Sequence, residues 1–347
     1  MFIPHLKTNH SYTVPFIVLS IGLIVCFFTN ISLGSVSIPF SDVFSSITGG
    51  EVSKSSWEFI IQEYRLPKAM MAIITGSGLA IAGLLMQTLF KNPLAGPFVL
   101  GISSGASLGV ALFILGGTAL GVSSALAFGK WGLIMAAAIG SFFVFLMVLG
   151  VASRVRDTMA LLIIGLMVGS LTGAVVSVLS YFSKAEELQQ YIFWSFGSLG
   201  DVSWESIHIL LLCFGIGLIL TIISIKPLNA LLLGDTYAKT IGIRQNRSRI
   251  IIIIATSILA GSITAFAGPI AFIGLAVPHL IRQIIPTSNH RILIPAIILG
   301  GAILMLICDT VAQVPFSEYT LPINAVTALV GAPVVIWLLV RKKKLLF

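Results

Sequence analysis

The sequence predicts an all-α integral membrane protein of about ten transmembrane helices. Three observations support this prediction. Of the 347 residues, 57% are hydrophobic and 9% are charged, whereas soluble domains carry about 25% charged residues. The apolar residues form successive stretches of roughly the 20 residues that an α-helix needs to cross a bilayer. Stretches such as 14–28 and 209–225 are apolar on every face, which disfavours the alternating pattern of a transmembrane β-barrel.

Hydropathy places the expected spans in order along a single domain, residues 1–347. The first stretch, 11–33, is too long for the core of a signal peptide, so we expect it to be retained. The eighth stretch is short. The ten expected centres are Gly22, Gly78, Gly105, Ala138, Ser170, Phe214, Ser257, Leu275, Ala302 and Gly331.

The distribution of charge predicts which side of the membrane each loop faces. An even number of spans puts both termini on one side, and short cytoplasmic loops are rich in Lys and Arg. With cytoplasmic termini, the inner segments hold 15 of the 20 basic residues: Lys7, Lys91, Arg154, Arg156, Lys226, Lys239, Arg244, Arg247, Arg249, Arg282, Arg291, Arg341, Lys342, Lys343 and Lys344. The net charge of +8 therefore reflects membrane orientation, and nucleic-acid binding is not expected.

Residues that could carry chemistry are scarce. The three cysteines lie inside apolar stretches without CxxC spacing, so we expect neither a disulfide nor a metal site. His279 follows Pro278 and is interpreted as a packing or capping residue. Segment 233–240 ends in Lys239-Thr240, as a phosphate-binding loop does, but lacks both glycines of that motif. We therefore expect no ATPase site in this chain.

Two rival functional classes need buried polar residues that the sequence hardly offers. An ion-coupled secondary transporter would place charged side chains inside its spans, and Asp309 is the only acidic residue near one. Asp309 could cap a helix, face a partner or relay protons. A membrane enzyme acting on lipids would need clustered acids or histidines, and only isolated ones occur.

Small residues form two further patterns. Glycines recur every four residues at 101, 105 and 109, and at 165, 169 and 173, which predicts close helix packing, within the chain in preference to a subunit interface. Ala95-Gly96-Pro97 and Ala267-Gly268-Pro269 each precede an expected helix. We expect these helices to start at the inner and outer face respectively, as an inverted repeat requires.

Several short motifs occur in order along nearly the whole chain. They are Arg65-Leu66-Pro67-Lys68, Gly83 to Gln87 with Phe90-Lys91-Asn92-Pro93-Leu94-Ala95, Gly101-Ile102-Ser103-Ser104-Gly105-Ala106, Leu233-Gly234-Asp235 with Ala238-Lys239 and Ile241-Gly242, Phe272-Ile273-Gly274-Leu275 with Pro278-His279 and Arg282, His290-Arg291, and Gly331-Ala332-Pro333. Together these motifs resemble those of the permeases of ABC importers for iron-siderophores, haem and cobalamin. The resemblance implies a transport subunit with no catalytic residue, metal site or cofactor of its own.

The resemblance also implies partners. These are a second permease, identical or related, two ATPase subunits that hold ATP and Mg, and an extracytoplasmic substrate-binding protein. The location it implies is the bacterial cytoplasmic (inner) membrane, in contact with lipid. The implied cargo is an iron(III)-siderophore, the commonest in the family, with haem or cobalamin as alternatives.

Individual roles follow from the same resemblance. Loop 228–244 is expected to form cytoplasmic coupling helices that contact the ATPase through Leu228, Leu233, Gly234, Asp235, Ala238, Lys239, Ile241 and Gly242. The binding protein is expected to dock at Arg65, Lys68 and Gln313. The gate and pathway are expected at Thr158, Met159, Asn92, Pro93, Gly101, Gly105, Phe272 and Gly274.

Four positions depart from the family pattern. Gln313 stands where arginine is common and Thr320 where glutamate is common, so we expect the outer docking surface to use fewer charges. Ala271 and Asn324 each stand where glycine is usual.

Overall fold

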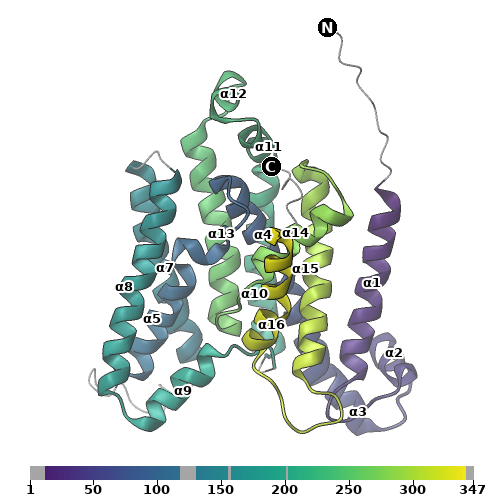
Figure 1. Cartoon of the computed structure of the whole chain (residues 1–347). Coiled ribbons are helices and arrows are strands. Elements are labelled where there is room, and N and C mark those ends of the chain that lie inside the picture. The colour runs from purple at the N-terminus through teal and green to yellow at the C-terminus, as the bar shows by residue number, and fades with distance from the viewer. Residues whose placement is uncertain (1–11, 118–129, 155–157, 201, 341–347) are drawn as a thin grey trace.

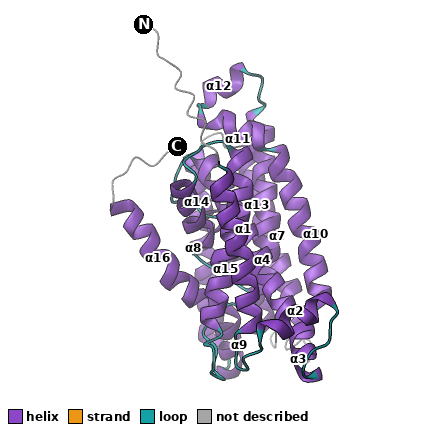
Figure 2. Ribbon diagram, turned by 90° about the vertical axis from the view of Figure 1, so that its right-hand side faces the viewer, coloured by secondary structure: helices purple, strands orange, loops and turns teal. Residues whose placement is uncertain are grey.

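The protein is a bundle of helices, and the computed structural model describes residues 12–117, 130–154, 158–200 and 202–340 (Figure 2). Within these ranges there is no β-strand, which confirms the all-α prediction. The helices are α1 (Thr13–Ser32), α2 (Phe40–Thr48), α3 (Ser55–Phe59), a π-helical turn (Ile60–Arg65), α4 (Leu66–Phe90), a 3₁₀ turn (Pro97–Leu100), α5 (Ile102–Ile114), α7 (Lys130–Arg154), α8 (Thr158–Phe182), α9 (Ala185–Ser195), α10 (Trp204–Ile223), α11 (Ile225–Leu232), α12 (Asp235–Thr240), α13 (Gln245–Ala267), α14 (Ile273–Ile284), α15 (His290–Ala312) and α16 (Ile323–Val340).

Ten of these helices coincide with the ten expected spans: α1, α4, α5, α7, α8, α10, α13, α14, α15 and α16. Among the described residues, seven helices are long and apolar enough to cross a membrane. The remaining three, α5, α14 and α16, have 13, 12 and 18 residues. The short eighth span was expected, whereas the shortness of α5 was not.

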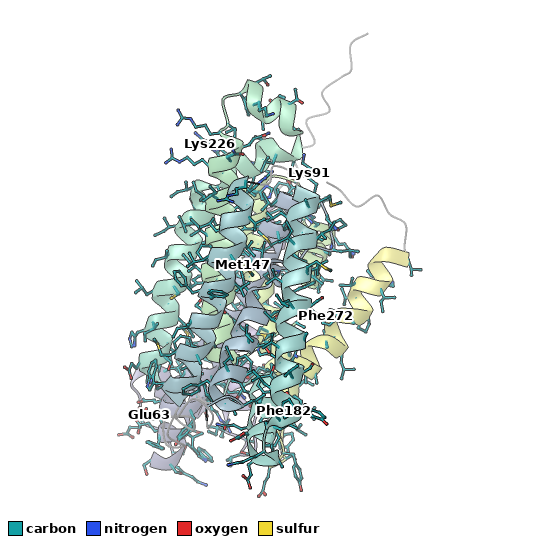
Figure 3. All side chains as sticks on the ribbon, turned by 90° about the vertical axis from the view of Figure 1, so that its left-hand side faces the viewer. Glu63, Lys91, Met147, Phe182, Lys226 and Phe272 are labelled. Atoms are coloured by element: carbon teal, nitrogen blue, oxygen red, sulfur yellow. The ribbon has the colours of Figure 1, made fainter. Side chains whose placement is uncertain are left out.

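The two ends of the bundle differ in the way that the charge distribution predicts. Helix α1 begins and α16 ends toward the end of the bundle that carries α11 and α12, while α2, α3 and α9 lie at the opposite end (Figure 1). Lys91 and Lys226 lie near the first end and Glu63 near the second (Figure 3). We call these ends inner and outer. Among the basic residues of the orientation argument, Lys7, Arg156 and those of 341–344 lie outside the described residues.

Helix α4 forms the centre of the bundle (Figure 1). Every residue from Ile74 to Phe90 is buried, and α4 contacts α10, α13, α14 and α15. A Cβ atom at Gly76 would overlap the carbonyl of Gly301, and one at Gly83 would overlap the carbonyl of Gly274. The backbone of α4 therefore touches α15 and α14 directly, an approach that only glycine allows.

The first glycine pattern also packs within the chain. A Cβ at Gly105 would lie 2.6 Å from the carbonyl oxygen of Gly140 on α7, and one at Gly109 would overlap the carbonyl of Ala136. In the second pattern, Gly165 meets the 3₁₀ turn before α5, whereas a Cβ at Gly173 would meet nothing within 4 Å. The preference for intrachain packing is confirmed for the first pattern and for part of the second.

Helices α5 and α14 both begin inside the bundle. Each follows one of the two Ala-Gly-Pro segments and a residue in the left-handed region, Gly101 with φ 71° and Phe272 with φ 66°. Pro97 and Pro269 of the two segments line one cavity together with Leu79, near the middle of α4. Both segments do precede helices, but the expectation that these helices start at the membrane faces was wrong.

The two short helices run in opposite directions from that level. Helix α5 extends toward outer helix α9, which it contacts, and α14 extends toward the inner end of α15. Figure 3 shows Phe272, the residue before α14, between the levels of Lys91 and Phe182. Each Ala-Gly-Pro segment thus enters the bundle from one face and is followed by a helix of about half the membrane thickness.

Candidate functional site

The inner loop 228–244 forms a helical hairpin at the inner end of the bundle, made of α11 and α12 (Figure 1). Gly234 joins the two helices with φ 108°, and Gly242 follows α12 with φ 83°. Side chains rarely adopt such φ values, so both turns need glycine. The hairpin then continues into α13.

The predicted coupling residues divide into two groups by burial. Leu228 and Ala238 are fully buried, so they pack the hairpin and cannot contact a partner. Leu233 and Ile241 are exposed by 66% and 52%, and Lys239 is also exposed. The side chain of Asp235 lies outside the described part of the chain.

The exposed residues of the hairpin include one that the sequence prediction missed. Tyr237 is 47% exposed and lies four residues from Leu233 and four from Ile241. We call these three residues the coupling tip. Tyr237 and Ile241 are four residues apart, a spacing typical of one helix face that could have revealed Tyr237 in the sequence, whereas Leu233 precedes the turn at Gly234. An apolar patch at the aqueous end of a protein marks an interaction site.

Arg65, a predicted docking residue, is engaged within the chain. Its guanidinium donates to the carbonyl oxygens of Ile31 and Ser32 at 2.7 and 3.0 Å, and also to that of Val36. These carbonyls lie at the end of α1 and in the loop that follows. Arg65 therefore fastens that loop to the start of α4, and its role in docking stays a prediction.

Lys68 and Gln313, the other predicted docking residues, meet at Asp309. The ammonium of Lys68 lies 3.2 Å from Asp309 Oδ1, and Gln313 Nε2 donates to Asp309 Oδ2 at 2.8 Å. Asn30 Nδ2 donates to the same Oδ2 at 2.9 Å. These four residues form the outer cluster. Asp309 is 2% exposed, so the partner that it faces belongs to this chain.

An open cavity of about 410 Å³ adjoins the outer cluster, with Lys68, Asp309 and Thr320 among its lining residues. Gln313 thus keeps a contact with Asp309 although it lacks the charge of arginine. Docking of a binding protein at this surface stays a prediction.

The predicted gate and pathway residues fall in separate places. Asn92 and Pro93 form the turn after α4, where the carbonyl oxygen of Pro93 accepts a hydrogen bond from His279 Nε2 at 2.8 Å. His279 is thus a packing residue, as expected. Thr158 and Met159 begin α8; Met159 is 54% exposed, and the side chain of Thr158 lies outside the described part.

Phe272 and Gly274 line the cavity between the two Ala-Gly-Pro segments, which has a volume of about 160 Å³. Two departures from the family pattern meet at the same cavity. The backbone N–H of Ala271 donates to Asn324 Oδ1 at 3.1 Å. A glycine at position 324 would lack this acceptor, so in this chain a side chain ties the start of α16 to the segment before α14.

At the inner end, Gln87, Arg282 and His290 were recognised as motif residues without an assigned role. Thr88 and Asn229 were missed, because single Thr and Asn residues at span ends carry no distinctive spacing. Arg282 of α14 donates to Gln87 Oε1 of α4 at 3.0 Å. Next to this contact, Thr88 and Asn229 both bond to His290. In the part of the chain that the structure describes, no three His, Cys, Asp or Glu side chains gather as a metal site would require.

Residues 22–341 match the FecCD transport family. The chain belongs to this family. It is similar to the hemin transport system permease protein HmuU of Yersinia pestis, with 34% identity over 94% of this chain and 95% of that protein. It is also similar to the vitamin B12 import system permease protein BtuC of Salmonella paratyphi A, with 35% identity over 86% of this chain and 89% of the relative.

Among solved structures, the chain resembles that of an inward-facing metal-chelate type ABC transporter. The TM-score is 0.82 and the identity 29%, over 96% of this chain and all of the other. As a FecCD-type permease, the protein is a transport component of an ABC importer and a multi-pass protein of the bacterial cytoplasmic membrane.

Proposed function

We propose that this chain and a second permease, identical or related, form the translocation path for a metal chelate, and that an iron(III)-siderophore is the cargo. The names of similar proteins support the class of cargo: a hemin permease, a vitamin B12 permease and a metal-chelate type transporter. Hemin and vitamin B12 both hold a metal inside an organic ligand. Haem is the second candidate, because the chain is 34% identical to the hemin permease over nearly its whole length.

The observation that supports ATP hydrolysis by a partner as the energy source is the coupling tip. Leu233, Tyr237 and Ile241 expose apolar surface on a hairpin that two glycine turns hold away from the bundle. Such a patch fits a groove on a soluble subunit better than it fits water. In this proposal two separate ATPase subunits, which hold ATP and Mg, bind the hairpins of the two permeases.

The import direction implies a further partner on the outer side. In this proposal an extracytoplasmic binding protein delivers the chelate to the outer end, where the outer cluster adjoins its open cavity. Because Arg65 and Lys68 already have partners within the chain, long-range charge attraction contributes less to this docking than free basic residues would.

The ATPase assignment is tested by co-purification. Leu233→Asp combined with Ile241→Asp places two charges on the coupling tip, and we expect the ATPase subunit to be lost from the purified complex and uptake to cease. Ile284→Asp is the matched control, because Ile284 is 51% exposed but lies at the end of α14, outside the hairpin. An ATPase that remains bound to the tip variant would refute the assignment.

The cargo is tested in cells whose only chelate permease is this one, together with its ATPase and binding protein. Radiolabelled ferric siderophore, haem and cobalamin are offered separately. Uptake by cells with the Leu233→Asp, Ile241→Asp variant gives the background. ATP-dependent uptake of the siderophore alone supports the first candidate. Uptake of haem or cobalamin instead would replace it while leaving the importer class intact.

A further inference from the structure

A hydrogen-bonded chain of three side chains connects the coupling hairpin to the centre of the bundle. Asn229 lies on α11, His290 is the first residue of α15, and Thr88 lies near the inner end of α4. His290 Nδ1 lies 2.7 Å from Asn229 Oδ1, and His290 Nε2 lies 2.9 Å from Thr88 Oγ1. Both His290 and Thr88 are fully buried. We call these three residues the inner linkage.

The contacts determine the proton positions in the inner linkage. The backbone N–H of His290 donates to Asn229 Oδ1 at 3.0 Å, which identifies that atom as the oxygen. An amide oxygen only accepts, so His290 Nδ1 carries a proton and donates to it. In the neutral imidazole Nε2 is then an acceptor, and the Thr88 hydroxyl donates to it. Each ring nitrogen of His290 has one partner in the inner linkage. The hydrogen bonds are therefore donated in one direction, from Thr88 on α4 to His290 and from His290 to Asn229 on α11.

The inner linkage lies where α11 meets α4 and α15. Helix α11 packs against α4 and α15 and carries the coupling tip beyond it. Gln87, the residue before Thr88 on α4, accepts a hydrogen bond from Arg282 of α14. Two adjacent side chains of α4 thus contact different helices. Thr88 connects α4 to α15 and, through His290, to α11, whereas Gln87 connects α4 to α14.

We infer that Asn229, His290 and Thr88 are positioning residues that transmit displacement of the coupling hairpin to α4 and α15 during transport. The inference rests on the proposed function, because it needs an ATPase bound at the coupling tip. Side-chain hydrogen bonds with fixed donors and acceptors keep α11 in register with α4. Apolar packing alone at this junction would let the helices slide, since it is non-directional.

A matched pair of substitutions on α4 tests the inference. Thr88→Val removes the hydroxyl of the inner linkage while keeping the shape of the side chain. Thr75→Val is the control: Thr75 is equally buried on the same helix, and its hydroxyl makes no hydrogen bond to any described residue. Thr88→Ser restores a hydroxyl and serves as the rescue. The complex of permease, ATPase and binding protein is purified and reconstituted into liposomes. The measured quantity is the ratio of chelate molecules transported to ATP molecules hydrolysed.

We expect Thr88→Val to retain the bound ATPase but to lower this ratio by about two- to tenfold, the range that loss of one hydrogen bond allows. Thr75→Val should keep the wild-type ratio, and Thr88→Ser should recover most of it. Equal ratios for the two valine variants would overturn the inference, since a merely structural role lowers stability without changing the stoichiometry.

Failure of the proposed function would have a different signature. A wild-type permease that retains no ATPase would overturn the proposed function, and with it the inference, because nothing would move the hairpin. A wild-type complex that transports with coupled hydrolysis, but with equal ratios for both valine variants, overturns the inference alone.

Discussion

The outer cluster and the inner linkage each connect α4 and α15 to a third helix, but with different chemistry. In the outer cluster the ion pair of Lys68 and Asp309 joins α4 to α15, and Asn30 of α1 donates to the same carboxylate, as does Gln313. The inner linkage joins α4 and α15 to α11 through neutral groups only. The same pair of helices is thus held by charge at the outer end and by neutral hydrogen bonds at the inner end.

This difference suggests which end stays fixed. Breaking a buried ion pair by removing one partner costs about 3–5 kcal/mol, whereas a neutral hydrogen bond contributes about 0.5–1.5 kcal/mol net. We therefore expect the outer end to serve as an anchor, because the inner end can rearrange at a smaller cost in free energy.

The largest expected effect comes from separating α4, which carries residues of both polar groups, from α14. Gly83→Leu would push its Cβ into the carbonyl of Gly274, and we expect at least about 3 kcal/mol of destabilisation, because backbone must move. Gly173→Leu on α8 meets nothing within 4 Å and should change stability by less than about 0.5 kcal/mol. Thermal unfolding of the purified proteins measures both, and similar melting temperatures would contradict the packing of α4.

Removing the charge of the anchor is the next largest change. Asp309→Ala leaves Lys68 and Gln313 without this acceptor and removes one of the three acceptors of Asn30. We expect a loss of about 2–3 kcal/mol, less than for a fully buried pair because Lys68 is 21% exposed. The double variant Lys68→Met, Asp309→Leu should recover part of this loss, since no unpaired charge remains. Thermal unfolding of both variants is the measurement, and a double variant no more stable than the single one would contradict the ion-pair account.

A smaller effect is expected when only the charge of Asp309 changes. Asp309→Asn keeps an amide oxygen that can accept from Asn30 and Gln313, so we expect a loss of about 1 kcal/mol and uptake that persists. Uptake of labelled chelate at equal membrane expression is the measurement. Abolished uptake with a bound, active ATPase would revive the ion-coupled transporter and remove the anchor role.

The smallest predicted effect concerns Asp42 of α2, a second carboxylate at the outer end, which holds the loop that contains Ser53. Its Oδ1 accepts from the Ser53 backbone N–H at 2.7 Å, and this hydrogen bond lowers the pKa of Asp42 below its ordinary value of 3.8. The native state binds protons less readily than the unfolded one, so this stabilisation is present above the ordinary pKa and lost as pH falls through the lowered one.

Hydrogen exchange at the Ser53 amide tests this prediction. Protection should fall in acid for the wild type, whereas Asp42→Asn keeps an acceptor oxygen but does not titrate, and its protection should vary less. Identical profiles for the two proteins would show that Asp42 does not control the loop.

The sequence was sufficient for the spans because the bilayer requires long apolar stretches, and every expected centre lies in a helix or at its border. It failed on the depth of α5 and α14. The start of a helix inside the bundle depends on backbone contacts such as Gly83 with Gly274, and hydropathy does not register such contacts. The motif residues on the hairpin were found from family resemblance, not from spacing.

Burial was the second gap. Ala238 and Ile241 belong to the same motif, yet one is fully buried and the other half-exposed; Ala238 lies within α12, whereas Ile241 follows its last residue. Asn30, Asn229 and Thr88 could not be recognised, since their partners are distant in the sequence and each is an ordinary residue alone. Asp309 was recognised as unusual, but its partners became clear only from the structure.

The length of α14 has a consequence for how the chain enters the membrane during synthesis. Its 12 residues span about 18 Å, well short of the roughly 30 Å hydrocarbon core, and it carries His279 and Arg282. A translocon that releases helices one at a time would not retain such a segment in lipid. Helix α14 is synthesised after α13 and before α15. We therefore expect it to be held in the membrane by packing against α4, which is already made, and against α15 as soon as that helix is complete.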